Sequence, residues 1–201
     1  MAFTFFFRDL HTIEHAVKNL VPLVQGRSKI RIWDAGCANG PEPYTLAIVL
    51  AENMGKFGFK NVQIVASDID ESQDFGSIVS EGIYSEEELK RIPPEIFTKY
   101  FFPLEGKPGF FAIDENIRCR VNYVKHDLLS LNPIDNNFSF ILCKNVLLHF
   151  QYPERIEVIK MFHNSLSEGG LFASEQTQKM PVEINHLFKQ VVPDAQLFQK
   201  I

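Results

Sequence analysis

The chain has 201 residues, 45% of them hydrophobic and 22% charged, which is enough for one domain with a buried core. Its net charge of −5, without a concentrated basic run, argues against nucleic acid as the main partner. No apolar stretch approaches the roughly 20 residues that span a bilayer, and Cys37, Cys119 and Cys143 lack disulfide or zinc spacing. We therefore expect a cytoplasmic protein that does not insert into a membrane.

The first hundred residues alternate helical and strand patterns. Apolar residues at helical spacing predict a helix over 10–24, and KIRIWDAG predicts a strand that ends at a turn. PEPYTLAIVLAENMG begins with prolines and closes on Gly55, which predicts a buried helix. NVQIVASDID predicts a second strand, and SQDFGSIVSEGIY a weaker helix. A capping box, Ser85 with Glu88, predicts a further helix that Pro93 and the next proline break.

The second hundred residues begin with a different pattern. Residues 101–121 hold glycines and prolines among short apolar runs, which predicts small β-hairpins. VNYVKHDLL, FSFILCKNVLLHF and LFASEQ predict strands, the second of them central because it is the most apolar. PERIEVIKMFHNSLSEGG predicts an amphipathic helix followed by paired glycines, and the tail HLFKQVVPDAQLFQKI an antiparallel hairpin.

This alternation predicts the fold class. Helices between strands imply a doubly wound, mainly parallel α/β sheet with right-handed crossovers. We expect one domain over 1–201, with a small antiparallel β subdomain inserted at about 101–121.

The turn after the first strand, IWDAGCANGPEPYTLA, predicts a ligand site. Gly36 and Gly40 allow the backbone to pass close to a ligand. A dinucleotide site usually has Gly-x-Gly-x-x-Gly, but Ala38 takes the middle place here and Glu42 would repel a phosphate. An NAD-dependent oxidoreductase is therefore disfavoured. S-adenosylmethionine has an ammonium, a sulfonium and no phosphate, so it suits a carboxylate.

Two further acids end predicted strands. Asp68 is placed to accept hydrogen bonds from ribose hydroxyls, and Asp127 could meet the adenine edge. The structural alternative is that Asp34 and Asp68 cap loops and that Glu42 is a first-turn helix acid. Residue types alone leave both interpretations open.

Several segments, in order, resemble one family. AGCANGPEPYTLA, ASDID, EGIYSEEELKRIPPE, KYF, HDLL, FILCKNVLLHF and LSEGGLFASE occur in this order in CheR-type methyltransferases, and TFFFRD resembles the segment before their catalytic domain. The resemblance covers essentially the whole chain. It implies a class I, Rossmann-like fold that uses S-adenosylmethionine to methylate glutamate side chains of bacterial chemoreceptors.

The resemblance also assigns site residues. It implies that Arg8 and His149 are catalytic residues at the methyl end of the cofactor. The residues expected to line the cofactor pocket are Thr4, Arg8, Gly36, Glu42, Asp68, Asp127, Leu128, Lys144 and Asn145. Glu42 would face the methionine end, Asp68 the ribose, and Asp127 with Leu128 the adenine. Arg8 would steer the incoming carboxylate.

The chain departs from the family pattern at three places. The family's N-terminal helical domain would lie before residue 1, Pro41 takes an often acidic place, and His149 takes a place that is often tyrosine. A CheR-like enzyme for another protein or a small molecule, and a non-catalytic S-adenosylmethionine sensor or adaptor, therefore remain alternatives. In the family the β insertion can also dock a receptor peptide, which the sequence leaves open here.

No metal site is expected. The six histidines show no His-Glu-x-x-His spacing, so structural roles are expected for most of them: His11, His15, His126, His149, His163 and His186. A glutamate substrate is already ionised at neutral pH, so the expected reaction needs no catalytic base.

Overall fold

The computed structural model describes residues 4–201 and confirms the α/β class. In this part of the chain seven strands form the main sheet in the order β6-β2-β1-β7-β8-β10-β9. Their bounds are Val121–Lys125 (β6), Val62–Asp68 (β2), Ile30–Ala35 (β1), Phe138–Cys143 (β7), Leu166–Ser174 (β8), Leu197–Lys200 (β10) and Phe188–Gln190 (β9). β6, β2, β1, β7 and β8 run parallel, and β10 is antiparallel to both β8 and β9.

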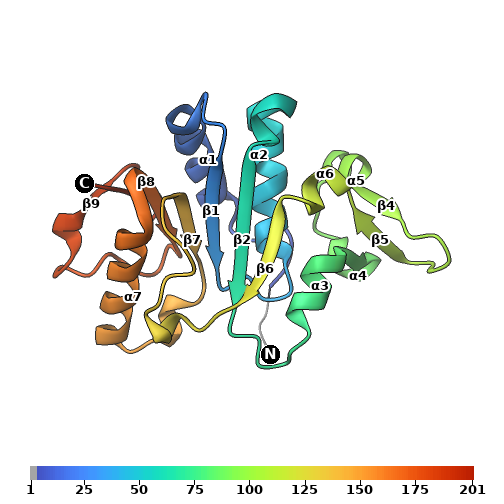
Figure 1. The fold of residues 1–201 in the computed structure, drawn as a ribbon. Coiled ribbons are helices and arrows are strands. Elements are labelled where there is room, and N and C mark those ends of the chain that lie inside the picture. The colour runs from blue at the N-terminus through green and yellow to red at the C-terminus, as the bar shows by residue number, and fades with distance from the viewer. Residues whose placement is uncertain (1–3) are drawn as a thin grey trace.

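Helices cover both faces of this sheet (Figure 1). α1 (Leu10–Val24) and α2 (Pro41–Phe59) pack on one face, over apolar side chains such as Ile32 and Phe140. α7 (Tyr152–Ser165) packs on the other, where Trp33 and Phe172 lie. Successive strand residues point to opposite faces, so the fully buried β7 supplies both cores.

A second, antiparallel sheet stands beside the first, on the side away from β9 in Figure 1. It has the order β3-β5-β4, with bounds Ile83–Ser85, Phe110–Ile113 and Phe101–Pro103. The short helices around it are α3 (Phe75–Glu81), α4 (Glu86–Leu89), α5 (Pro94–Tyr100) and α6 (Glu115–Arg118). The expected antiparallel insertion is thus present, but β3 comes from before residue 101 and α6 is helical.

Two local features differ from the sequence prediction. α2 does not close on Gly55: that residue takes φ +67°, which kinks the helix, and the chain then turns on to Phe59. The paired glycines expected after α7 lie inside β8, where the pairing with β7 shifts register. Carbonyl oxygens of Ser167 and Phe138 lie 2.9 and 3.0 Å from where a Cβ on Gly170 would be, so the bulge requires glycine.

Three further predicted features are present in the structure. The capping box at Ser85 is formed, β7 is central, and β9 and β10 make the C-terminal hairpin. Among the described residues, no helix is both long and apolar enough to cross a membrane.

Candidate active site

A cavity of ≈ 700 Å³ opens at the carboxyl ends of the parallel strands. A second cavity of ≈ 130 Å³ adjoins it, and both are lined by Gly36, Asp68, Ile69, Val146 and Phe150. The strand order reverses here: β2 and β6 lie on one side of β1, whereas β7 and β8 lie on its other side. Such switch points are where open α/β sheets bind ligands.

The structure brings all the predicted site residues to these two cavities. The larger one is lined by Thr4, Arg8, Gly36, Glu42, Asp68, Lys144, Asn145 and His149, and the smaller one by Asp127 and Leu128. Their individual roles stay predictions. Val146 and Phe150 were not predicted; both line the two cavities, and both follow Asn145 in the same apolar run.

The glycine turn is fixed to β2. The N–H groups of Gly36 and Cys37 both donate to the carbonyl of Ser67, at 2.7 and 3.0 Å. Ala38 takes φ +48°, and its N–H donates to Asp68 Oδ2 at 2.9 Å. Asp68 Oδ1 accepts the N–H of Asp70 at 3.1 Å. Asp68 therefore braces the turn and also lines the cavity, so its structural role is confirmed and its contact with the ribose stays a prediction.

Gly36 makes room for a protein side chain rather than only for a ligand. A Cβ here would lie 2.1 Å from Val146 Cγ2, and φ is +98°. We expect Gly36→Ala to lower the free energy of unfolding by about 2–4 kcal/mol, from the clash and the positive φ. Gly26→Ala is the control, since φ is +79° but nothing lies within 4 Å of the added Cβ. Urea unfolding should show a clearly smaller loss for the control; equal losses would contradict this explanation.

Three ionisable side chains are buried beneath the cavity. Glu42 starts α2, Lys144 follows β7, and Asp34 lies in β1. Lys144 Nζ lies 3.0 Å from Glu42 Oε2, and the two side chains are 1% and 10% exposed. Asp34 is fully buried, and neither of its oxygens accepts a hydrogen bond from residues 4–201; Glu42 Oε1 also lacks such a partner there.

Burial dominates the titration of this group. Desolvation raises the pKa of Asp34 well above its ordinary range, and the nearby Glu42 carboxylate raises it further. Desolvation also raises the pKa of Glu42, against the opposing charge of Lys144. The Lys144 ammonium therefore lies close to two carboxyl groups, those of Glu42 and Asp34. Its charge pairs with Glu42, and burial favours the neutral form of Asp34 by raising its pKa.

The segment before α1 covers one wall of the cavity. Phe6 is fully buried and packs in T-shaped geometry against Tyr84 and Phe101, with ring centroids 4.9 and 5.4 Å apart. The N–H of Phe7 donates to Thr45 Oγ1 at 3.0 Å, and Lys144 Nζ donates to the Arg8 carbonyl at 3.2 Å. These contacts fix the backbone on both sides of Arg8.

Arg8 is consequently held at the cavity by a defined partner. Its Nη2 donates to Asn145 Oδ1 at 3.0 Å, and its side chain is 28% exposed. Asn145 takes φ +60° directly after β7 and Lys144. The guanidinium is therefore anchored yet still accessible from the cavity.

Two other predicted site residues, Asp127 and His149, lie at short 3₁₀ turns. Asp127 Oδ1 accepts the Leu129 N–H at 2.9 Å and caps a 3₁₀ turn, Leu128–Ser130, which leaves the second carboxylate oxygen for the small cavity. His149 ends a second such turn, Leu147–His149, and lies exposed at the large cavity.

S-adenosylmethionine fits this pair of cavities. The unpartnered, buried Glu42 Oε1 is an acceptor suited to an ammonium. Each Asp68 oxygen accepts one N–H from the protein and keeps a lone pair for a hydroxyl. Leu128, Val146 and Phe150 give the smaller cavity an apolar lining for a base. The fold and this pocket together define the class of S-adenosylmethionine-dependent methyltransferases.

Comparison with known proteins gives the family. The chain belongs to the CheR methyltransferase family, because residues 2–196 match its S-adenosylmethionine-binding domain. Its cofactor is therefore S-adenosylmethionine, as the sequence predicted.

Three relatives have closely related names. The chain is 29% identical over 195 residues to a "probable chemotaxis protein methyltransferase" of Rhizobium etli, covering 94% of this chain and 72% of that protein. It is 31% identical to "chemotaxis protein methyltransferase 1" of Pseudomonas aeruginosa (89% and 67%) and 32% identical to a "chemotaxis protein methyltransferase" of Borreliella burgdorferi (82% and 60%). The chain thus spans 60–72% of the length of these relatives.

Proposed function

We propose that this methyltransferase transfers methyl groups to glutamate carboxylates of chemoreceptors and forms methyl esters. The observation that carries the proposal is Arg8, a cation anchored by Asn145 at the rim of a cavity whose other charged lining is largely acidic. A fixed guanidinium is suited to a carboxylate substrate. The names of the relatives support a chemotaxis substrate.

The proposed chemistry needs alignment and charge placement. Bound S-adenosylmethionine supplies an electrophilic methyl group on a positively charged sulfur. A glutamate side chain is ionised at neutral pH, so one of its oxygens can bond to the methyl carbon without losing a proton. The carbon–sulfur bond breaks in the same displacement, and the neutral thioether S-adenosylhomocysteine is the leaving group. Arg8 orients the carboxylate and partly neutralises it as it leaves water, while the Lys144–Glu42 pair keeps the floor of the cavity fixed.

The remaining residues bind the cofactor in this proposal. Glu42 accepts the ammonium, Asp68 the ribose hydroxyls, and Asp127 with Leu128 flanks the adenine. We place the reaction in the cytoplasm, which is consistent with three free thiols, Cys37, Cys119 and Cys143.

A labelling experiment tests the product. The protein is incubated with methyl-labelled S-adenosylmethionine and membranes that contain chemoreceptors, and the membranes are then treated with mild alkali. We expect incorporated label that alkali releases as volatile methanol, because esters hydrolyse and methylated amines do not. A receptor whose acceptor glutamates are replaced by alanine is the control and should stay unlabelled.

Two outcomes would contradict the proposal. Label that survives alkali would show methylation of nitrogen rather than of a carboxylate. Label that enters receptors and the alanine control equally would show that the acceptor lies elsewhere, as in the alternative of a CheR-like enzyme with another substrate.

A further inference from the structure

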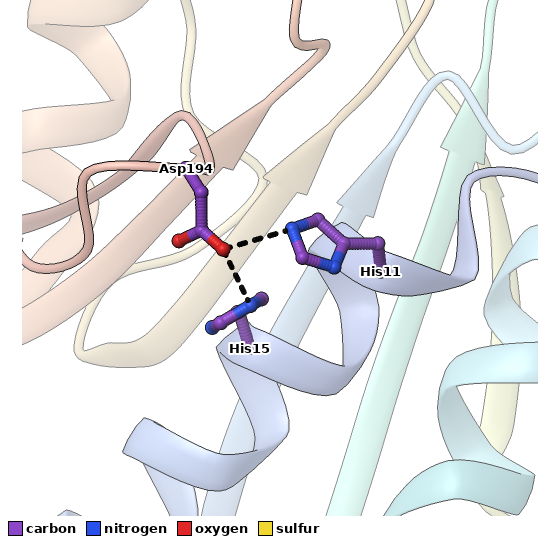
Figure 2. Close-up of side chains that lie close together, drawn as sticks. All are labelled: His11, His15 and Asp194. Carbon is purple, nitrogen blue, oxygen red and sulfur yellow. Dashed lines mark ion pairs between the residues drawn. The ribbon is translucent and has the colours of Figure 1, made fainter.

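Three side chains of metal-ligating types converge outside the linings of the two cofactor cavities. His11 and His15 lie one turn apart on α1, and Asp194 lies in the loop between β9 and β10. Figure 2 shows the three side chains pointing toward one another. One potential ligand atom from each lies within 4.8 Å of the other two.

Two of the three spacings among these atoms match those of a tetrahedral metal site. Asp194 Oδ2 lies 3.3 Å from His11 Nε2 and 3.4 Å from His15 Nε2. Bonds of about 2.0–2.1 Å to zinc place neighbouring tetrahedral ligands about 3.3–3.4 Å apart. Both distances are longer than the roughly 2.7–3.2 Å of an N–H···O hydrogen bond. Two edges of the tetrahedron are therefore already formed.

The backbone around the site is held in place. The Asp194 carbonyl accepts Gln176 Nε2 at 2.7 Å, and the next carbonyl, that of Ala195, accepts Gln190 Nε2 at 3.2 Å. Ala195 is fully buried. On the other side, α1 buries its apolar face against the main sheet, so the two histidines keep a fixed spacing. Binding an ion requires little more than side-chain rotation.

We infer that His11, His15 and Asp194 form a binding site for a divalent transition-metal ion of the zinc type. Two imidazoles and one carboxylate are ligands that zinc accepts, whereas calcium and magnesium prefer oxygen. Three protein ligands leave a fourth position open to water. A bound ion would tie α1, which begins two residues after Arg8, to the C-terminal hairpin. The inference does not depend on the methyl acceptor.

Metal titration of the full chain tests the site. The protein carries no affinity tag and has Cys119→Ser throughout, because an exposed thiol could bind zinc by itself. Calorimetry at neutral pH should show one zinc ion per chain, and cobalt should give the visible absorption of a tetrahedral site. His15→Ala and Asp194→Asn should each weaken binding more than about 100-fold, beyond the loss expected for a group that only supports a ligand.

A matched variant separates this site from general binding to histidine. His186 is exposed and is not a member of the cluster, so His186→Ala should keep the wild-type affinity. Circular dichroism checks that each variant is folded. Equal zinc affinity in wild type and His15→Ala, or no zinc binding by the wild type, would overturn the inference and leave His11, His15 and Asp194 as a surface ion pair.

Discussion

Lys144→Met should lower the free energy of unfolding by about 3–5 kcal/mol at neutral pH, the largest stability effect that we expect in this chain. The substitution keeps much of the aliphatic length of the side chain but removes its charge. Glu42 would then be a buried carboxylate without its 3.0 Å partner, next to the buried Asp34. The Arg8 carbonyl would also lose a hydrogen-bond donor. Urea unfolding measures the loss.

An exposed ion pair provides the control. Lys160 Nζ lies 2.8 Å from Glu157, but the two side chains are 45% and 51% exposed. Lys160→Met should therefore change stability by no more than about 1 kcal/mol. If both lysine variants lost the same amount, the buried pair would have no special contribution.

The loss of unfolding free energy in Lys144→Met should depend on pH. In the folded protein the pKa of Glu42 is raised by burial, and removing the lysine charge raises it further. A carboxyl group whose pKa is higher in the folded state stabilises the fold below its unfolded pKa, and that stability is lost as pH rises through the folded pKa. The difference between variant and wild type should therefore shrink as pH falls toward about 4.3.

The main sheet could be predicted because its signals are local. Each parallel strand is a short apolar run with an acid or a turn at its end, and parallel strands place those ends at one edge. That is why Glu42, Asp68 and Asp127 could be assigned to one site before their distances were known. β3 could not be predicted, because Ile83–Ser85 forms a strand only by pairing with β5, and its sequence alone favours the end of a helix.

The features that could not be predicted depend on contacts between distant segments. Asp34 was considered as a loop cap, but it is a fully buried acid above which Glu42 and Lys144 pair. No local pattern shows which carboxylate a lysine will meet. His15 and Asp194 also lie at nearly opposite ends of the chain, and only the packing of α1 beside the C-terminal hairpin brings them together.

Arg8→Ala is expected to lower turnover by about 10²–10³-fold, the size of effect seen when one preorganised electrostatic donor is removed from an active site. Cofactor affinity should change much less, because Glu42 and Asp68 hold the ligand in our proposal, whereas Arg8 acts on the incoming carboxylate. Calorimetry with S-adenosylhomocysteine and a methylation assay measure the two quantities separately.

Two further variants make this prediction specific to the charge and its position. Arg8→Lys keeps a positive charge but loses the planar group that donates to Asn145, so its turnover should fall between wild type and Arg8→Ala. Arg27 lies at the opposite end of the sheet, where it donates to Ser139 at 3.4 Å, and Arg27→Ala should keep wild-type turnover. A charge that acts on the incoming carboxylate lowers kcat, whereas a group that only anchors the cofactor raises its dissociation constant. A loss for Arg8→Ala that appeared only in cofactor affinity would therefore place Arg8 in cofactor binding and remove it from the methyl transfer.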